Sequence, residues 1–387
     1  MKRFWIFILA SFAGFSQQIK VSVTNNLAFA RKEIVSVPTS KLTKIVALGF
    51  ETIHVKPKGK SENLVVQWLD PNADGKPDEL LFQAEVPANS KSEYIIFSDN
   101  AFISKTTSET KAFSRFVPER TDDYAWENDK VAFRTYGPDA QNRFEQKRPN
   151  GTLSSGIDIW LKRTEKPVVD NWYLGYQSDP MFYHKDRGEG YDPYHVGASR
   201  GTGGTGIWIG DSLVVSKNFV GWKTIADGPL RTTFELVYAP FSDFGLTETK
   251  RISLDLGSNF YKAEVTYKSK KTVPNYAIGI TLHKNEGEVK IDTKNGIFRH
   301  FEKIDDAFVG EGVIVSPVAI FDAFAHKSKT PDQSNLIILT DASRNLVYYA
   351  GFAWTKSGQI ATVADWDEML ARQSKIVANP LVVKISN

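Results

Sequence analysis

Residues 231–269 read RTTFELVYAPFSDFGLTETKRISLDLGSNFYKAEVTYKS, and this stretch decides the fold class. β-branched and aromatic residues fill three runs, RTTFELVYAPF, ETKRISLDLG and NFYKAEVTYKS, which turn residues separate. Similar runs extend from Ile207 to Trp354 without an intervening helical period, whereas a parallel α/β sheet needs a helix between its strands. We therefore predict a mostly β chain with a large antiparallel sandwich over residues 106–387.

The composition is that of a chain with a sizeable core and no strong charge. Of the 387 residues, 41% are hydrophobic and 12% are aromatic, which favours sheets over helical bundles. The net charge is +3, both signs are interspersed, and no block of like charge appears. A balance this close to neutrality argues against a nucleic-acid partner.

The amino terminus has the pattern of an export signal. Lys2 and Arg3 precede an apolar run from Phe4 to Phe15, and Gly14 and Ser16 stand at the −3 and −1 positions of a cleavage site. Residues 1–16 are therefore a predicted signal peptide, and neither they nor any later stretch is long enough to span a membrane. The chain has no cysteine, which excludes disulfides and a lipid-bearing cysteine, and a periplasmic location fits best.

Residues 17–105 form a predicted small β domain of short alternating runs such as IKVSVTN, EIVSVP and ELLFQAEV. Within it, Asp70, Asn72, Asp74 and Gly75 match the start of a calcium loop. The twelfth position of that loop is Leu81, where an EF-hand needs a bidentate glutamate. A tight hairpin turn is the preferred interpretation.

A polar Ser/Thr/Lys-rich segment, residues 101–110, is a predicted linker to the large domain. The loop DDYAWEND follows it and contains Trp126, Glu127 and Asn128. Arg134 then lies on a predicted strand with Tyr136. An arginine at this position is either a surface ion pair or a clamp for an anionic ligand.

The densest group of titratable, aromatic and glycine residues is Asp179–Trp208, DPMFYHKDRGEGYDPYHVGASRGTGGTGIW. A run this polar with this many glycines predicts a long loop on a rigid scaffold, where binding and catalytic groups often lie. Its candidates for acid–base chemistry are His184, Tyr194 and His195, because imidazole titrates near neutrality and a positioned phenol can exchange a proton. Glu189 and Asp192 beside them either orient a histidine or bind sugar hydroxyls.

Several sequence motifs are matched by their letters, but the secondary structure predicted around them is not the one that each motif requires. The run Gly201–Gly206 matches GxGxxG and Gly197–Gly201 matches GxSxG, but each leads into a predicted strand, where a dinucleotide site and a nucleophile elbow both need a helix. No HExxH occurs, and CxxC is excluded by the absence of cysteine. The sequence therefore predicts no metal ligands and requires no cofactor, although a divalent cation is compatible with it.

His283 ends the apolar run IGITLH and is a further candidate that points into a cleft. The other three histidines have no other candidate residues near them in the sequence and are predicted surface or core residues. They are His54, His300 and His326. Tryptophans in the large domain either stack on sugar rings or fill the core.

Four segments together resemble a known family: PERTDDYAWENDKVAFRTYG, YHKDRGEGYDPYHVG with its glycine run, DGPLRTTFELVY and YYAGFAWTKSG with DWDEML. The family has an uncharacterised domain and is encoded in polysaccharide-utilisation loci of marine Bacteroidetes; it includes an ulvan oligosaccharide dehydratase. The resemblance covers most of the mature chain. It implies a galactose-mutarotase-like double β-sandwich, or supersandwich, and a carbon–oxygen lyase that removes water from a non-reducing-end uronic acid. Relatives often carry an acidic residue shortly after the histidine, where this chain has Lys185, Asp186 and Arg187, and His195 occupies a position that the resemblance implies to be variable.

That chemistry assigns roles to the candidates. Elimination needs a cation on the uronate carboxylate, a base for the C5 proton and an acid for the departing C4 oxygen. Arg134 is the predicted carboxylate clamp, His184 and Tyr194 are the acid–base pair in an order left open, and His283 is the reserve. The predicted substrate-binding residues are Trp126, Glu127, Asn128, Glu189, Asp192 and His195.

Two other functions stay open at this stage. A glycoside hydrolase would need two opposed carboxylates, such as Glu127 and Glu189. A non-catalytic glycan-binding protein would use the same cleft without turnover. In each case the expected partner is an oligosaccharide, and the sequence leaves the oligomeric state open.

Overall fold

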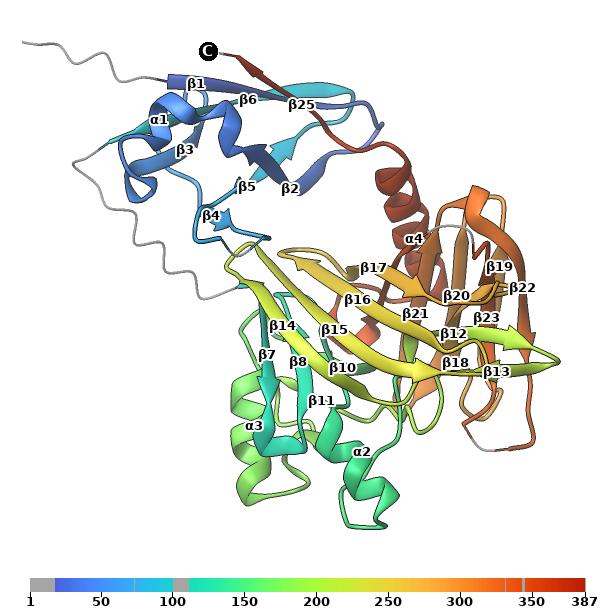
Figure 1. Ribbon diagram of the computed structural model, residues 1–387. Coiled ribbons are helices and arrows are strands. Elements are labelled where there is room, and N and C mark those ends of the chain that lie inside the picture. The colour runs from blue at the N-terminus through green and yellow to red at the C-terminus, as the bar shows by residue number, and fades with distance from the viewer. Residues whose placement is uncertain (1–17, 73, 100–110, 331, 343–344, 387) are drawn as a thin grey trace, which may run out of the picture.

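The computed structural model describes residues 18–386 apart from 73, 100–110, 331 and 343–344, and the remainder is drawn as a thin grey trace in Figure 1. The predicted signal peptide, residues 1–16, and the predicted linker, residues 101–110, lie outside the described residues.

The amino-terminal part of the chain contains two sheets around one core (Figure 1). The sheet orders are β25-β1-β6-β3 and β2-β5-β4. The strands are β1 (Gln18–Asn25), β2 (Arg31–Pro38), β3 (Ile53–Pro57), β4 (Val66–Leu69), β5 (Glu79–Val86), β6 (Ser90–Ser98) and β25 (Val382–Ser386), and the short helix between β2 and β3 is α1 (Thr43–Val46).

The predicted division into residues 17–105 and 106–387 needs one correction, which concerns the last strand of the chain. β25 pairs antiparallel with β1, with Val383 opposite Val23, so the last strand of the chain belongs to the amino-terminal sheet. The sequence of this strand does not indicate which sheet it joins, because its pairing partner depends on the path of the whole chain.

The calcium-like motif is a hairpin turn, as predicted. β4 and β5 are antiparallel neighbours, with Leu69 opposite Glu79. The Asp70 carboxylate accepts hydrogen bonds from the backbone amides of Asp74, at 3.2 Å, and Gly75, at 2.8 Å. These hydrogen bonds cap the turn from within.

Three sheets build the large domain. One has eight strands in the order β14-β15-β16-β17-β24-β21-β20-β19, and the other two have five each, β11-β10-β9-β8-β7 and β13-β12-β18-β23-β22. Their bounds are β7 (Phe113–Val117), β8 (Asp123–Glu127), β9 (Ala132–Thr135), β10 (Asp158–Lys162), β11 (Gly190–Tyr191), β12 (Thr202–Ile209), β13 (Ser212–Val214), β14 (Phe219–Asp227), β15 (Arg231–Phe241), β16 (Leu246–Asp255), β17 (Phe260–Lys268), β18 (Tyr276–Thr281), β19 (Glu288–Asp292), β20 (Ile297–Ile304), β21 (Ala307–Val315), β22 (Ile320–His326), β23 (Asn335–Thr340) and β24 (Leu346–Trp354).

One core joins the three sheets and confirms the predicted fold class. Buried residues from the eight-stranded sheet, such as Phe234 and Ile252, pack with Phe133 of one five-stranded sheet and Ile278 of the other. The strand pairs are antiparallel throughout the named sheets, as the absence of helical periods predicted. The chain is thus a mostly β, multi-sheet sandwich.

The alternation of side chains along β16 shows how this core acquires polar groups. Leu246, Glu248, Lys250, Ile252 and Leu254 all face inward, because successive side chains of a strand point to opposite faces. Glu248 and Lys250 are therefore carried into the interior together, where their charged atoms lie 3.0 Å apart.

Helices cover the outer faces of the sheets. They are α2 (Pro138–Glu145), α3 (Val169–Ser178) and α4 (Val363–Ala378), with short 3-10 turns η1 (Thr39–Lys41), η2 (Phe50–Thr52), η3 (Pro118–Arg120), η4 (Phe182–His184), η5 (Pro317–Ala319) and η6 (Thr355–Ser357). α4 begins at a capping box between Thr362 and Asp365. Trp366 of α4 packs on β21 at Gly310, where a Cβ would come within 2.5 Å of the indole.

The sequence did not predict α2 and α3. α3 lacks a local cap, and instead the Glu127 carboxylate on β8 accepts hydrogen bonds from the amides of Val168 and Val169, each at 2.9 Å. A helix whose first turn is stabilised from a distant strand gives little local signal.

The glycine run is strand rather than flexible loop. β12 begins at Thr202, earlier than the strand predicted at Ile207. Tyr261 and Tyr348 donate hydrogen bonds to the carbonyls of Thr202 and Gly203, and a Cβ on Gly203 would lie 2.3 Å from the Tyr261 hydroxyl. The glycine is required by this close approach of two tyrosines.

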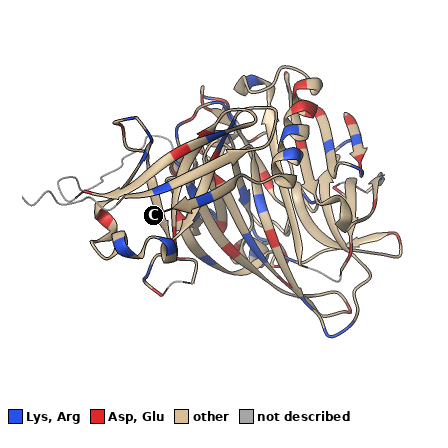
Figure 2. Ribbon diagram, turned by 90° about the horizontal axis from the view of Figure 1, so that it is seen from above, with Lys and Arg blue, Asp and Glu red and all other residues tan. Residues whose placement is uncertain are grey.

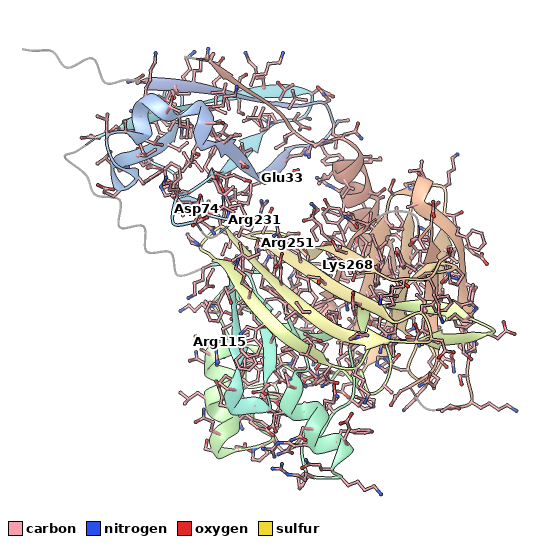
Figure 3. All side chains as sticks on the ribbon, in the orientation of Figure 1. Glu33, Asp74, Arg115, Arg231, Arg251 and Lys268 are labelled. Carbon is pink, nitrogen blue, oxygen red and sulfur yellow. The ribbon has the colours of Figure 1, made fainter. Side chains whose placement is uncertain are left out.

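The small domain and the sandwich contact each other beside a cavity. Gln67 on β4 hydrogen-bonds to the backbone of Leu230 and Arg231 at the β14–β15 turn. Beside this contact is a cavity of about 1360 Å³, with Glu33 and Arg231 on opposite walls (Figure 3).

Charged residues of both signs are distributed over the sheets and helices, as Figure 2 shows. Among the described residues, no helix is long and apolar enough to cross a membrane.

Candidate active site

The segment predicted to carry the site is an ordered connection between α3 and β12. It contains η4 and the short strand β11, which pairs with β10 through Tyr191 and Leu161. Within it, the Asp186 carboxylate accepts hydrogen bonds from the amides of Gly188, at 2.8 Å, and Gly190, at 3.2 Å. The glycines permit the left-handed turns that fold the segment back, with φ of +104° at Gly188 and +117° at Gly190.

A buried cationic centre lies beneath this segment. The Arg134 guanidinium, on β9, donates to Asp158 at 2.6 Å and to Asp192 at 2.8 Å. It also donates to the Tyr183 hydroxyl at 3.1 Å and lies 3.6 Å from Asp123. The side chain of Arg134 is only 6% exposed, so its donors are directed at protein groups.

This geometry corrects the role predicted for Arg134. A carboxylate clamp needs a free guanidinium fork, and Nε, Nη1 and Nη2 of Arg134 are all engaged. Arg134 instead fixes Asp192 and Tyr183, which lie on either side of His184 in the folded segment. It is a positioning residue.

His184 has the geometry of a general base. Its Nδ1 lies 2.8 Å from the backbone carbonyl of Asp192, which can only accept, so Nδ1 carries the proton. The Asp192 carboxylate is farther away, at 3.7 Å from Nδ1. The lone pair is therefore on Nε2, and the side chain is 34% exposed. Nε2 has no hydrogen-bond partner among the described residues.

The electrostatic surroundings keep His184 neutral. Partial burial lowers the pKa of His184 below its ordinary value, and the nearby Arg134 and Arg120 guanidinium groups lower it further. A neutral imidazole with a fixed tautomer and an accessible Nε2 can accept a proton.

Arg120 is the residue that sequence reasoning missed. It ends η3, and its guanidinium donates to the Tyr183 hydroxyl at 3.2 Å and stacks 5.0 Å from the centre of the Tyr176 ring. Its Nη2 has no hydrogen-bond partner within the part of the chain that the structure describes. The PERTDD segment contains Arg120, but only the fold brings this arginine into contact with Tyr183.

A second polar cluster lies on the other side of the segment and contains Tyr194 and His283. The Tyr194 hydroxyl donates to Glu311 on β21, and His283 lies 2.7 Å from Glu302 on β20 through Nδ1. Between the two carboxylates, His300 lies 3.1 Å from Glu311. Tyr194 and His283 also pack edge to face, with ring centres 4.7 Å apart.

Neither Tyr194 nor His283 presents a free group to a ligand here. The Tyr194 phenol is buried, and burial beside Glu311 raises its pKa well above the usual value. His283 uses both ring nitrogens, because Nε2 lies 2.8 Å from the backbone carbonyl of His195. The structure thus places the two residues together, in a network that holds the segment on the sandwich.

Three predicted substrate-binding residues are in the interior. Trp126 stacks on Phe133 in the core. Glu127 forms a buried ion pair with Lys162 at 2.7 Å while it caps α3. Asn128 is buried and donates to two backbone carbonyls. The prediction that these residues contact a sugar is at odds with their burial, and we leave them out of the site.

The other three predicted binding residues differ in exposure. The Asp192 side chain is buried against Arg134. Glu189 is half-buried and accepts from the Trp172 indole at 3.4 Å. His195 is 71% exposed and lies 3.3 Å from Asp332. Glu189 and His195 are therefore accessible to a ligand, whereas Asp192 contributes its carbonyl to His184.

Comparisons with known proteins identify relatives over the whole sandwich. Residues 23–383 match the family described as a domain of unknown function (DUF4861). "Uncharacterized protein P7" from Formosa agariphila is 38% identical over 375 residues, 96% of this chain and 94% of that protein. A protein in the Glycosyl Hydrolase Family 38 and an alpha-mannosidase, both from Enterococcus faecalis, are each 7% identical with a TM-score of 0.46 over 96% of this chain. The chain spans 47% and 46% of these two structures, and so distant a likeness assigns no activity.

Replacing Arg134 should show that it is structural. Arg134→Met leaves the surrounding buried carboxylates without their cation, and we expect a loss of about 3–5 kcal/mol in the free energy of unfolding, measured by chemical denaturation. As a control, Arg163→Met removes an exposed ion pair with Asp186 and should change stability by less than about 1 kcal/mol. Equal denaturation midpoints for Arg134→Met and the wild type would contradict this role.

Proposed function

We propose that this chain, which belongs to the family described as a domain of unknown function (DUF4861), is a carbohydrate-active enzyme of the carbon–oxygen lyase class. Its reaction is the elimination of water from the non-reducing-end uronic acid of polysaccharide-derived, ulvan-like oligosaccharides. The observation that carries the proposal is His184, a neutral imidazole with a fixed tautomer and an accessible Nε2 beside an arginine. The resemblance of the segment YHKDRGEGYDPYHVG to an oligosaccharide dehydratase supports the same chemistry.

The first step is removal of the C5 proton of the uronate. The electrons of the C5–H bond move toward the carboxylate, and the His184 Nε2 lone pair takes the proton. This proton becomes acidic only when the charge on the adjacent carboxylate is neutralised. A cation must therefore face the carboxylate at the distance of a hydrogen bond.

Arg120 takes over the role that the sequence assigned to Arg134. Its Nη2 donor is used by no described residue, and its positive charge contributes to the lowered pKa of His184. The Tyr176 ring on which Arg120 stacks limits its movement. One arginine thus neutralises the carboxylate while keeping the base unprotonated.

The second step returns the proton. As the C4–C5 double bond forms, the C4–O bond breaks and the leaving oxygen must be protonated to depart as water. The His184 imidazolium formed in the first step is that donor where the C5 hydrogen and the C4 oxygen are on one face of the ring. Tyr194, predicted for this role, donates its phenol proton to Glu311 and supports the segment from behind.

The hydrolase alternative is not better supported. A glycosidase needs two carboxyl groups facing the scissile bond. Glu127, one of the two proposed from the sequence, is fully buried and paired with Lys162. Recognition without turnover would use the same surface as the proposed reaction, and the assay below separates it.

Export to the periplasm remains part of the proposal. It rests on the amino-terminal pattern of residues 1–16, which lie outside the described residues, and on the absence of cysteine. An enzyme that shortens or modifies imported oligosaccharides would meet its substrates there.

Incubation with saturated, uronate-ended ulvan oligosaccharides should produce the ultraviolet absorbance of an unsaturated uronate without a new reducing end. His184→Gln should lower the rate at least about 100-fold, the usual contribution of a general base, while its circular dichroism matches the wild type. The control His326→Gln, on β22, should retain full activity. A new reducing end without the chromophore would indicate hydrolysis, and binding without either product would leave recognition alone.

Arg120→Gln should lower kcat/KM by about 10- to 100-fold, because a hydrogen bond between charged groups contributes about 1.5–3 kcal/mol. The same variant should discriminate less between the uronate substrate and its uncharged uronamide. Arg187→Gln is the matched control, since its exposed side chain pairs with Asp179 in the same segment. If Arg120→Gln kept wild-type discrimination, the carboxylate would have another partner.

The pH dependence of kcat/KM should report the His184 pKa. Below that pKa the imidazole is protonated and inactive as a base, so activity should rise with pH and level off. The midpoint should lie below the ordinary histidine value of 6.5. Arg120→Gln removes a nearby positive charge and should move the midpoint upward. A midpoint above 6.5 in the wild type would exclude His184 as described.

A further inference from the structure

The most concentrated set of metal-binding side chains lies under Tyr194, apart from the proposed base. His300 and Glu302 are two residues apart on β20 and so share one face of the strand. Glu311 on β21 is the direct cross-strand partner of His300. One ligand atom from each of the three side chains lies within 4.8 Å of the other two, and all three residues are buried.

The separations suit a small cation. His300 Nδ1 is 3.1 Å from a Glu311 oxygen and 3.9 Å from a Glu302 oxygen. Ligands bound about 2.0–2.2 Å from one tetrahedral ion lie about 3.3–3.6 Å from each other. His300 Nδ1 is therefore within a few tenths of an ångström of this spacing from both carboxylates, and the two carboxylate oxygens lie within 4.8 Å of each other.

Each of the three groups is held by a neighbour that orients it as a ligand. His300 Nε2 lies 2.9 Å from the Glu286 carbonyl, which fixes the proton on Nε2 and leaves Nδ1 toward the carboxylates. Glu302 is held by His283 at 2.7 Å, and Glu311 by the Tyr194 phenol and, at 3.2 Å, by Thr202. A histidine ligand that donates its second N–H to a carbonyl, beside hydrogen-bonded carboxylates, is the usual outer shell of a metal site.

Burial adds a charge requirement. Two carboxylates in the interior need compensating positive charge, because an unpaired buried charge is strongly unfavourable. Among the described residues, no Lys or Arg forms an ion pair with Glu302 or Glu311, whose ion-pair partners are His283 and His300. A divalent cation between the two carboxylates and a neutral His300 gives a net charge of zero.

We propose that His300, Glu302 and Glu311 bind a divalent transition-metal ion, with Zn²⁺ as the fitting member of the class. One imidazole nitrogen with two carboxylates excludes soft ions that prefer thiolates, and the imidazole favours Zn²⁺ over Mg²⁺ and Ca²⁺. Because Glu311 also holds Tyr194 and Glu302 also holds His283, the ion stabilises the segment between His184 and His195 on the sandwich. The metal site stands independently of the proposed lyase reaction.

The test measures zinc binding directly. The full chain is treated with a chelator, dialysed and titrated with ZnCl₂ by calorimetry, and its metal content is measured after gel filtration. We expect one zinc per chain and a zinc-dependent rise in the melting temperature, since an ion that binds only the folded state stabilises it. Cobalt(II) in place of zinc should show visible bands of a low-symmetry nitrogen–oxygen site.

Variants separate this site from surface binding. Glu302→Gln and Glu311→Gln should each weaken zinc binding more than about 100-fold, whereas His283→Gln, in the outer shell, should weaken it about 10- to 100-fold. His195→Gln removes the most accessible histidine of the segment and should bind zinc like the wild type. If a ligand variant fails to fold, the cobalt spectrum of the wild type decides. No stoichiometric zinc in the wild type, or equal affinity in the ligand variants, would overturn the proposal.

Discussion

The arrangement around Arg134 is the interaction on which the site depends. One guanidinium joins β9 to β10 through Asp158 and to the segment after β11 through Asp192. Burial raises the pKa of Asp192 well above its usual range, and the charges of Arg134 and Arg120 oppose that rise. Removing the central cation would leave buried carboxylates that lack a hydrogen-bonded cation and are shielded from water. The accessible His184 is held by the Asp192 carbonyl, and the Asp192 carboxylate is in turn fixed by Arg134.

Strand geometry explains why so many polar groups are inside the sandwich. A side chain faces the core at every second position, whatever its chemistry. On β16 this places Glu248 and Lys250 in the interior, and on β20 and β21 it gathers His300, Glu302 and Glu311. Such groups cost free energy to bury, so each one has to find a partner within the fold. The polar clusters are consequences of sheet register.

The two faces of the segment between α3 and β12 have different roles. On one face, the Asp192 carbonyl fixes the tautomer of His184, and burial and the neighbouring guanidinium groups lower its pKa. On the other face, Tyr194 is directed inward to Glu311. A loop with many glycines keeps a defined shape because both faces are tied to sheets, which is what a base needs to meet a substrate at a fixed position.

The sequence by itself determined the fold class, the hairpin at Asp70 and the segment that contains His184. These follow from local patterns, since β-branched runs, turn residues and the neighbours of a histidine are all readable along the chain. Only the tertiary structure decided that Arg134 and Glu127 are buried, that Arg120 contacts Tyr183, and that β25 joins the first sheet. Those facts depend on which strands pair and which side of each faces the core, and residues far apart in the chain set both. His300 was indistinguishable from a core residue until register placed it opposite Glu311.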